Sequence, residues 1–161
     1  MKMNAASIKN QKAEWEALGV KLPAFDHEAM TAKTKEHPVW VHVGAGTIFR
    51  GFIAGLQQRL LNAGLAESGI VAAETFDYDI IDKIYVPHDS MTLMVSLKAD
   101  GSTQKEVIAS IAKGIKANCA DEAQWQQLTD VFTAPSLQMA SFTITEKGYA
   151  LRNMKGELMP V

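Results

Sequence analysis

The chain has 161 residues, of which 47% are hydrophobic and 21% charged, and it carries a formal net charge of -2. This composition is typical of one globular domain, and the scattered basic residues exclude a nucleic-acid-binding surface. No stretch approaches the roughly 20 apolar residues of a membrane helix, the start lacks the apolar block of a signal peptide, and Cys119 is the only cysteine. We therefore expect a cytoplasmic protein with no membrane or nucleic-acid partner.

Residues 1–36 form a charged segment with helical character. The spacing of Ile8, Trp15 and Leu18 predicts one helix, and Asp26 is a candidate N-cap for a second helix through Met30. We interpret this segment as a helical N-terminal extension to a domain that spans residues 37–161.

An apolar strand from Val39 to Val43 ends at two alternate glycines, and a helical pattern follows at once. Gly44 can take the backbone angles of a sharp turn, and the missing side chain at Gly46 lets a pyrophosphate approach the main chain. The free amides of the helix would face the phosphate charge. The helix should run from Thr47 to Ala63 and pack on a sheet through apolar residues at three- and four-residue steps: Phe49, Phe52, Ile53, Leu56, Leu60 and Leu61.

The remaining elements alternate between strands and helices. Short apolar runs predict strands at 69–74, 91–97 and 137–145, and a helix at 122–132 should pack Trp125, Leu128 and Phe132. Residues 103–115 predict a further helix, with a short strand at its start as the alternative, because Thr103 and Glu106 have capping-box spacing. The expected fold is α/β, with a doubly wound, mostly parallel sheet.

A G-x-G pair alone is weak evidence for a nucleotide site, and Phe49 replaces the third glycine of the G-x-G-x-x-G pattern. Three segments in order are more specific: VHVGAGTIFR at 41–50, DYDIIDKIY at 77–85 and FTITEKGY at 142–149. Together they resemble the N-terminal, cofactor-binding domain of the mannitol dehydrogenase and hexuronate reductase family, most of all its fructuronate reductase branch. The G-x-G-x-x-x-R form of that family explains the missing glycine.

This resemblance implies a Rossmann-like domain that binds NAD for hydride transfer between a keto-hexuronate and a sugar acid. The turn would supply a first group of cofactor-binding residues: Gly44, Ala45, Gly46, Thr47, Ile48, Phe49 and Arg50. An acid after the second strand would bind the adenosine ribose and repel a 2′-phosphate, and either Glu74 or Asp77 can do this, with Asp77 the better match to the family. The resemblance places Thr145, Glu146 and Lys147 near the nicotinamide.

No catalytic residue is expected in this chain. The family carries its proton-transferring lysine, with an asparagine and a histidine, in a following helical domain, so we expect the substrate to bind there and these 161 residues alone to be inactive. The four histidines lack metal-ligand spacing, so we expect no metal site, and His42 is interpreted as a partly buried residue with a hydrogen-bond partner.

Three alternative functions share parts of these patterns. A mannitol-type polyol dehydrogenase would carry every motif seen here, and a stand-alone nucleotide-binding module would need no second domain. A methyltransferase that uses S-adenosylmethionine also has a glycine-rich turn after its first strand, but it leaves the segment from Thr145 to Tyr149 unexplained.

Overall fold

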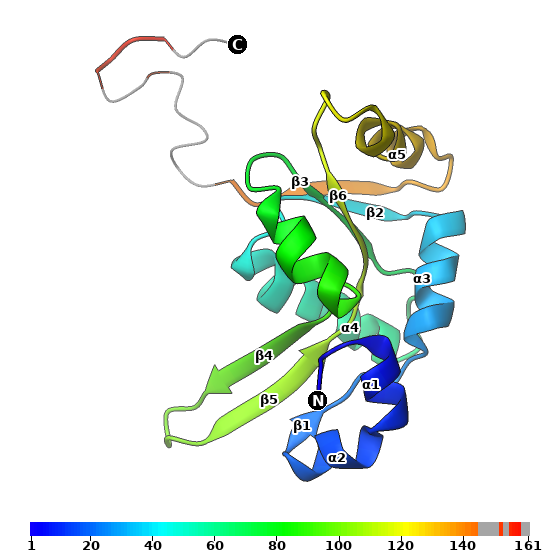
Figure 1. Ribbon diagram of the computed structural model, residues 1–161, viewed down its shortest axis with the longest axis vertical. Helices are drawn as coiled ribbons and strands as arrows, with labels where there is room; N and C mark the ends of the chain where they lie inside the picture. The colour runs from blue at the N-terminus through cyan, green and yellow to red at the C-terminus, as the bar shows by residue number, and fades with distance from the viewer. Residues whose placement is uncertain (145–151, 153–154, 159–161) are drawn as a thin grey trace.

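The computed structural model describes residues 1–144, 152 and 155–158 (Figure 1). Its centre is a four-stranded sheet in the order β6-β3-β2-β7, in which all three strand pairs are parallel. β2, the first of these strands in the sequence, lies inside the sheet between β3 and β7. The last two strands in the sequence, β6 and β7, form the two opposite edges, as in a doubly wound dinucleotide-binding fold. The prediction of a mostly parallel, doubly wound sheet is confirmed. The strands are β2 (Trp40–Val43), β3 (Ile70–Glu74), β6 (Ile111–Lys116) and β7 (Met139–Phe142).

Helices cover both faces of this sheet because its strands are apolar on both sides. All five residues of β3 are buried, and alternate side chains point to opposite faces: Ile70 and Ala72 to one cluster, Val71 and Ala73 to the other. The first face is covered by η1 (Phe49–Ile53), α4 (Ala54–Asn62) and η2 (Ile81–Tyr85), and the second by α5 (Glu122–Thr133). A short helix η3 (Val86–His88) follows η2.

A second, three-stranded sheet joins the N-terminal segment to the rest of the chain. Its order is β1-β5-β4, and Figure 1 shows β4 and β5 extending away from the central sheet as a hairpin. Trp15 and Val20 from the N-terminal segment pack with Met91 and Val107 in a separate cluster. The elements are α1 (Ala5–Asn10), α2 (Lys12–Ala17), β1 (Val20–Lys21), α3 (His27–Glu36), β4 (Thr92–Leu97) and β5 (Thr103–Ile108).

The N-terminal segment is therefore only partly what the sequence predicts. Its first helix is two short helices that meet at Gln11, and β1 was not predicted. The cap of the next helix is confirmed, because the Asp26 carboxylate accepts a hydrogen bond from the Ala29 N–H at 3.0 Å.

The helix predicted across residues 103–115 is wrong. Two strands of different sheets, β5 and β6, occupy this stretch. Thr103 and Glu106 lie opposite Leu97 and Met94 in the antiparallel hairpin and do not cap a helix. The β-branched residues that match helical steps also suit buried strands, and pairing with neighbouring strands decides between the two.

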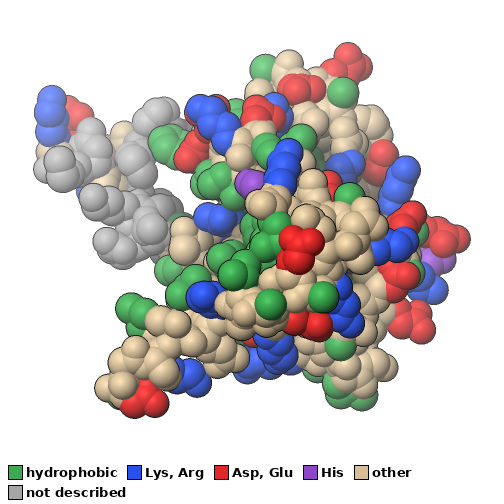
Figure 2. Space-filling view, turned by 60° about the horizontal axis from the view of Figure 1, so that its bottom comes forward, with side chains coloured by type: hydrophobic (Ala, Val, Ile, Leu, Met, Phe, Trp, Pro, Cys, Tyr) green, Lys and Arg blue, Asp and Glu red, His purple; other side chains and the backbone are tan. Residues whose placement is uncertain are grey.

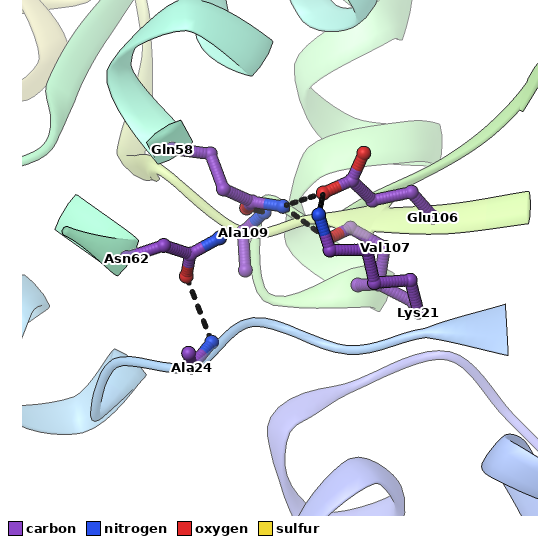
Figure 3. Close-up of polar contacts among 7 residues, drawn as sticks. All are labelled: Lys21, Ala24, Gln58, Asn62, Glu106, Val107 and Ala109. Carbon is purple, nitrogen blue, oxygen red and sulfur yellow. Dashed lines mark hydrogen bonds and ion pairs between the residues drawn. The ribbon is translucent and has the colours of Figure 1, made fainter. Parts of the chain in front are cut away.

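The chain passes from one sheet to the other at Ala109 and Ser110, and Gln58 of α4 satisfies the backbone there (Figure 3). Gln58 Nε2 donates to the Val107 carbonyl at 2.7 Å, and Gln58 Oε1 accepts from the Ala109 N–H at 2.6 Å. In the same close-up Asn62 Oδ1 accepts from the Ala24 N–H at 2.8 Å. Helix α4 thus bonds the sheet crossing and the N-terminal segment together.

Of the six apolar residues predicted to face the core from this helical segment, three do so and three do not. Phe49, Ile53 and Leu61 pack in the core, whereas Phe52 of η1 and Leu56 and Leu60 of α4 are 63%, 41% and 44% exposed. The polar residues Gln57 and Gln58 of α4 are buried instead. In α5 only Leu128 of the three predicted core residues is buried, because Trp125 and Phe132 are about half exposed. An apolar stripe on a helix predicts a contact surface but not which partner covers it.

Acidic and basic side chains are interspersed on the face of the molecule seen in Figure 2, with no broad area of one sign. Among the described residues, no helix is long and apolar enough to cross a membrane.

Replacing Gln58 with leucine should lower the free energy of unfolding by about 2–6 kcal/mol, because two buried backbone groups lose their partner at about 1–3 kcal/mol each. Urea unfolding followed by circular dichroism measures this. The matched control is Gln126→Leu on the exposed side of α5, which should change stability by less than about 0.5 kcal/mol. Equal effects of the two substitutions would contradict the bridging role of Gln58.

Candidate cofactor site

The predicted glycine turn lies where the carboxyl ends of β2, β3 and β7 meet, which is the ligand-binding edge of open parallel sheets. Gly44 has a φ of +105°, and a Cβ there would lie 2.8 Å from Thr143 Oγ1 and 2.9 Å from the Thr143 carbonyl oxygen. Only glycine fits, both for the backbone angle and for the approach of the segment after β7.

Gly46 faces open space instead. A Cβ built at Gly46 would meet no atom within 4 Å, and the side chains of Thr47 and Ile48 are exposed beside it. Since the first turn of a helix leaves its N–H groups without intrahelical acceptors, these amides are available to an anion. The turn therefore fits the pyrophosphate of a dinucleotide.

The peptide groups of Ala45, at the centre of the turn, are held from two sides. Glu74 Oε2 accepts from the Ala45 N–H at 2.8 Å, and the Tyr85 hydroxyl donates to the Ala45 carbonyl at 3.1 Å. Burial raises the pKa of Tyr85 above its ordinary value of 10.0; the charge of Arg50 opposes this shift, and the charge of Glu74 adds to it. The tyrosine is thus a neutral hydrogen-bond donor. Tyr85 is the last residue of the family-like segment at 77–85, but nothing in the sequence predicts its bond to the turn.

Glu74 lies beside the turn, as its position at the end of β3 predicts, but its carboxylate is engaged with the protein. Its Oε1 accepts from the N–H groups of Thr75, Phe76 and Asp77 at 3.0, 3.0 and 3.3 Å. With the Ala45 bond to Oε2, the carboxylate accepts four hydrogen bonds from backbone N–H groups, three of them on Oε1. The Asp77 side chain, by contrast, is exposed.

Arg50 brings a positive charge to the turn. Its guanidinium lies 3.5 Å from Thr47 Oγ1 and 3.4 Å from Thr92 Oγ1, and its buried Nε has no hydrogen-bond partner. No carboxylate within the described ranges forms a salt bridge with it. A cation held by hydroxyl groups alone keeps donors for a phosphate or a carboxylate.

Phe49 and Ala45 are fully buried, so only their backbone groups can meet a ligand. Phe49 stacks on His42, with ring centroids 4.1 Å apart and planes inclined by 5°. His42 Nδ1 lies 2.8 Å from Ser141 Oγ, and Nε2 lies 3.3 Å from Thr143 Oγ1. The predicted hydrogen-bond partner of His42 is confirmed, and its burial is complete rather than partial.

His42 joins β2 to β7 as a neutral ring, because burial lowers its pKa from 6.5 to about 4. The other predicted contacts, Thr145, Glu146 and Lys147, lie outside the described residues. Within the described part of the chain, no group of three or more His, Cys, Asp or Glu side chains could hold a metal ion.

No family model matches the chain. It is 44% identical over 160 residues to D-mannonate oxidoreductase of Thermotoga maritima, covering 99% of this chain and 29% of that protein. Its structure is similar to mannitol 2-dehydrogenase of Pseudomonas fluorescens, solved as a ternary complex with NAD and D-mannitol, with a TM-score of 0.74, 26% identity and coverage of 99% and 30% of the two chains. The predicted resemblance of the chain to the N-terminal domain of the mannitol dehydrogenase and hexuronate reductase family is confirmed.

Two further proteins are similar to the chain over less of its length. An uncharacterised oxidoreductase of Escherichia coli, YeiQ, is 26% identical over 139 residues, which cover 86% of this chain and 26% of that protein. A substrate-free D-sorbitol dehydrogenase has the same fold, with a TM-score of 0.66, 23% identity and coverage of 88% and 28%. The chain spans less than a third of the length of each of these four relatives.

The burial of His42 predicts a pH dependence of stability. The unfolded chain binds a proton on this ring near pH 6.5, whereas the folded protein does so only near pH 4, so the free energy of unfolding should fall as the pH drops through this range. The contribution of His42 is at most about 3 kcal/mol.

Urea unfolding at a series of pH values, compared between the native chain and His42→Gln, isolates this effect. The variant should lose less stability between pH 6.5 and 4 than the native chain. Parallel curves would show that His42 is not held neutral by the fold.

Proposed function

We propose that this chain is the NAD-binding part of an oxidoreductase that interconverts a keto-hexuronate and its sugar acid, such as fructuronate and mannonate. The observation that carries the proposal is the turn at Gly46, which is open in front and has its central peptide held by Glu74 and Tyr85. The Thermotoga relative is a D-mannonate oxidoreductase, and the Pseudomonas structure contains NAD. The bound cofactor would accept or donate the hydride, and the protein would orient it.

Each part of the turn has a role in this proposal. The amides of Gly46, Thr47 and Ile48 would bind the pyrophosphate, with Arg50 adding a charge-assisted bond. One of the acids at the end of β3, Glu74 or Asp77, would disfavour the 2′-phosphate of NADP. Thr145, Glu146 and Lys147 would lie near the nicotinamide. The nucleotide-binding domain would span residues 37–161 with residues 1–36 as its extension, in a cytoplasmic protein.

The exposed stripe on η1 and α4 would hold the remainder of such an enzyme. Ile48, Phe52, Leu56 and Leu60 follow one another at four-residue steps and are 41–69% exposed, and Met139 of β7 is 44% exposed. A contiguous exposed apolar surface is typical of a contact with further polypeptide, and the relatives are more than three times as long as the matched segment. We expect the additional polypeptide, including the substrate-binding helical domain, to pack on this stripe.

A mannitol-type polyol dehydrogenase is the second candidate, favoured by the likeness to mannitol 2-dehydrogenase. The higher identity to D-mannonate oxidoreductase, 44% against 26% at the same 99% coverage of this chain, supports the sugar-acid substrate.

Substituting Gly46 with valine should abolish NADH binding while leaving the domain folded, because the new side chain would fill the open space in front of the turn. Isothermal titration calorimetry measures the affinity, and circular dichroism checks the fold. The control is Gly55→Ala in α4, whose Cβ would make an ordinary 3.9 Å contact with Ile108 and should not affect binding. Unchanged affinity in folded Gly46→Val would assign this turn a purely structural role.

The purified 161-residue chain should bind NADH weakly and should not oxidise mannonate or mannitol. Holding the substrate against the nicotinamide supplies roughly 7–11 kcal/mol of the barrier, and the proton-transferring residues add a further hundredfold or more. Both tasks belong to the helical domain in this proposal. The absorbance of NADH in a steady-state assay measures turnover, and a rate near that of a complete dehydrogenase would contradict the proposal and direct attention to Lys147.

A further inference from the structure

Phe76 is the most exposed large hydrophobic residue in the described part of the chain, at 93%. It lies in the loop between β3 and η2, two residues after the buried Glu74. No cluster of the core includes it. The Phe76 side chain therefore contributes nothing to the packing of the described fold, and it is available to contact a ligand.

The loop that carries Phe76 is fixed relative to the cofactor turn by one carboxylate. Glu74 Oε1 accepts from the Phe76 N–H at 3.0 Å, and Glu74 Oε2 accepts from the Ala45 N–H at 2.8 Å. The loop and the turn therefore form two adjacent walls at the carboxyl edge of the sheet. In dinucleotide-binding folds the adenosine ribose lies at the end of this second strand, so the adenine lies next to the loop that follows.

The same hydrogen bonds give Glu74 and Asp77 different roles. Glu74 is only 7% exposed, and its carboxylate accepts hydrogen bonds from four backbone N–H groups. Asp77 is exposed one residue beyond Phe76 and has a side chain free to approach a ribose. Glu74 therefore fixes the shape of the site, whereas Asp77 can contact the ribose of the cofactor.

Resting on the proposed binding of NAD, we propose that Phe76 is the stacking surface for the adenine ring. Asp77 discriminates the ribose from its 2′-phosphate, and Glu74 is a positioning residue that holds the loop against the turn. Stacking of the adenine on an aromatic side chain does not involve the nicotinamide. Phe76 should therefore contribute equally to the affinity of every adenine nucleotide.

Calorimetric titration of the purified chain with NADH, NADPH and ADP tests this assignment. Phe76→Ala should weaken all three affinities about tenfold, and Phe76→Tyr should restore them. Phe132→Ala is the matched control, because Phe132 is also exposed, at 49%, but lies on α5 at the other face of the sheet. It should change none of the three.

The ratio of the NADH affinity to the NADPH affinity distinguishes the role of Asp77 from that of Glu74. Asp77→Asn should reduce this ratio, whereas Glu74→Gln should weaken both cofactors equally and lower the melting temperature, because an amide N–H₂ would face backbone donors.

Three results would overturn the inference. Native-like affinities in Phe76→Ala would remove the adenine assignment while leaving NAD binding intact. A changed cofactor ratio in Glu74→Gln but not in Asp77→Asn would make Glu74 the ribose ligand. If the native chain binds none of the three nucleotides, the proposed function fails and this inference fails with it.

Discussion

The hydrogen bonds to the two peptide groups of Ala45 set the shape of the candidate site. Glu74 brings the end of β3 to the N–H, and Tyr85 brings the end of η2 to the carbonyl. The turn after β2 is thereby tied to two segments that follow it by 29 and 40 residues. Since Gly46 is the next residue, the direction in which the helix amides point depends on these two bonds.

The rest of the fold supports this edge of the sheet. Stacking of His42 on Phe49 and the bonds from its ring to Ser141 and Thr143 hold β7 beside β2. Just before the start of β6, Gln58 hydrogen-bonds to the backbone where the chain passes from the three-stranded sheet to the four-stranded sheet. Buried polar side chains thus join segments that apolar packing alone would leave free to slide, because each bond is lost if the register changes.

The central strands could be predicted from sequence because strands buried on both faces are continuous apolar runs. Residues 103–115 could not, because Val107, Ile108, Ile111 and Ile115 satisfy helical steps and strand pairing equally well, and the choice depends on β3, β4 and β1. For a related reason, the sequence predicts a core contact for apolar residues of η1 and α4 that are exposed. Their apolar spacing predicts a contact, but not whether the described domain provides it.

The candidate site likewise has residues that the sequence predicts and contacts that it does not. Gly44, Gly46 and Arg50 follow from local spacing, because a turn and the first turn of a helix are set by neighbouring residues. The role of Tyr85 and the four bonds of Glu74 depend on contacts between distant segments, and no local pattern encodes them.

A titration of the ¹⁵N-labelled chain with ADP-ribose, followed by NMR, tests the central claim most directly, because it reports on each backbone amide separately. The account predicts that the amide signals of Gly46, Thr47 and Ile48 shift together with those of Phe76 and Asp77, while those of α5 stay in place. Saturable binding that shifts other amides and leaves the turn unmoved would contradict it.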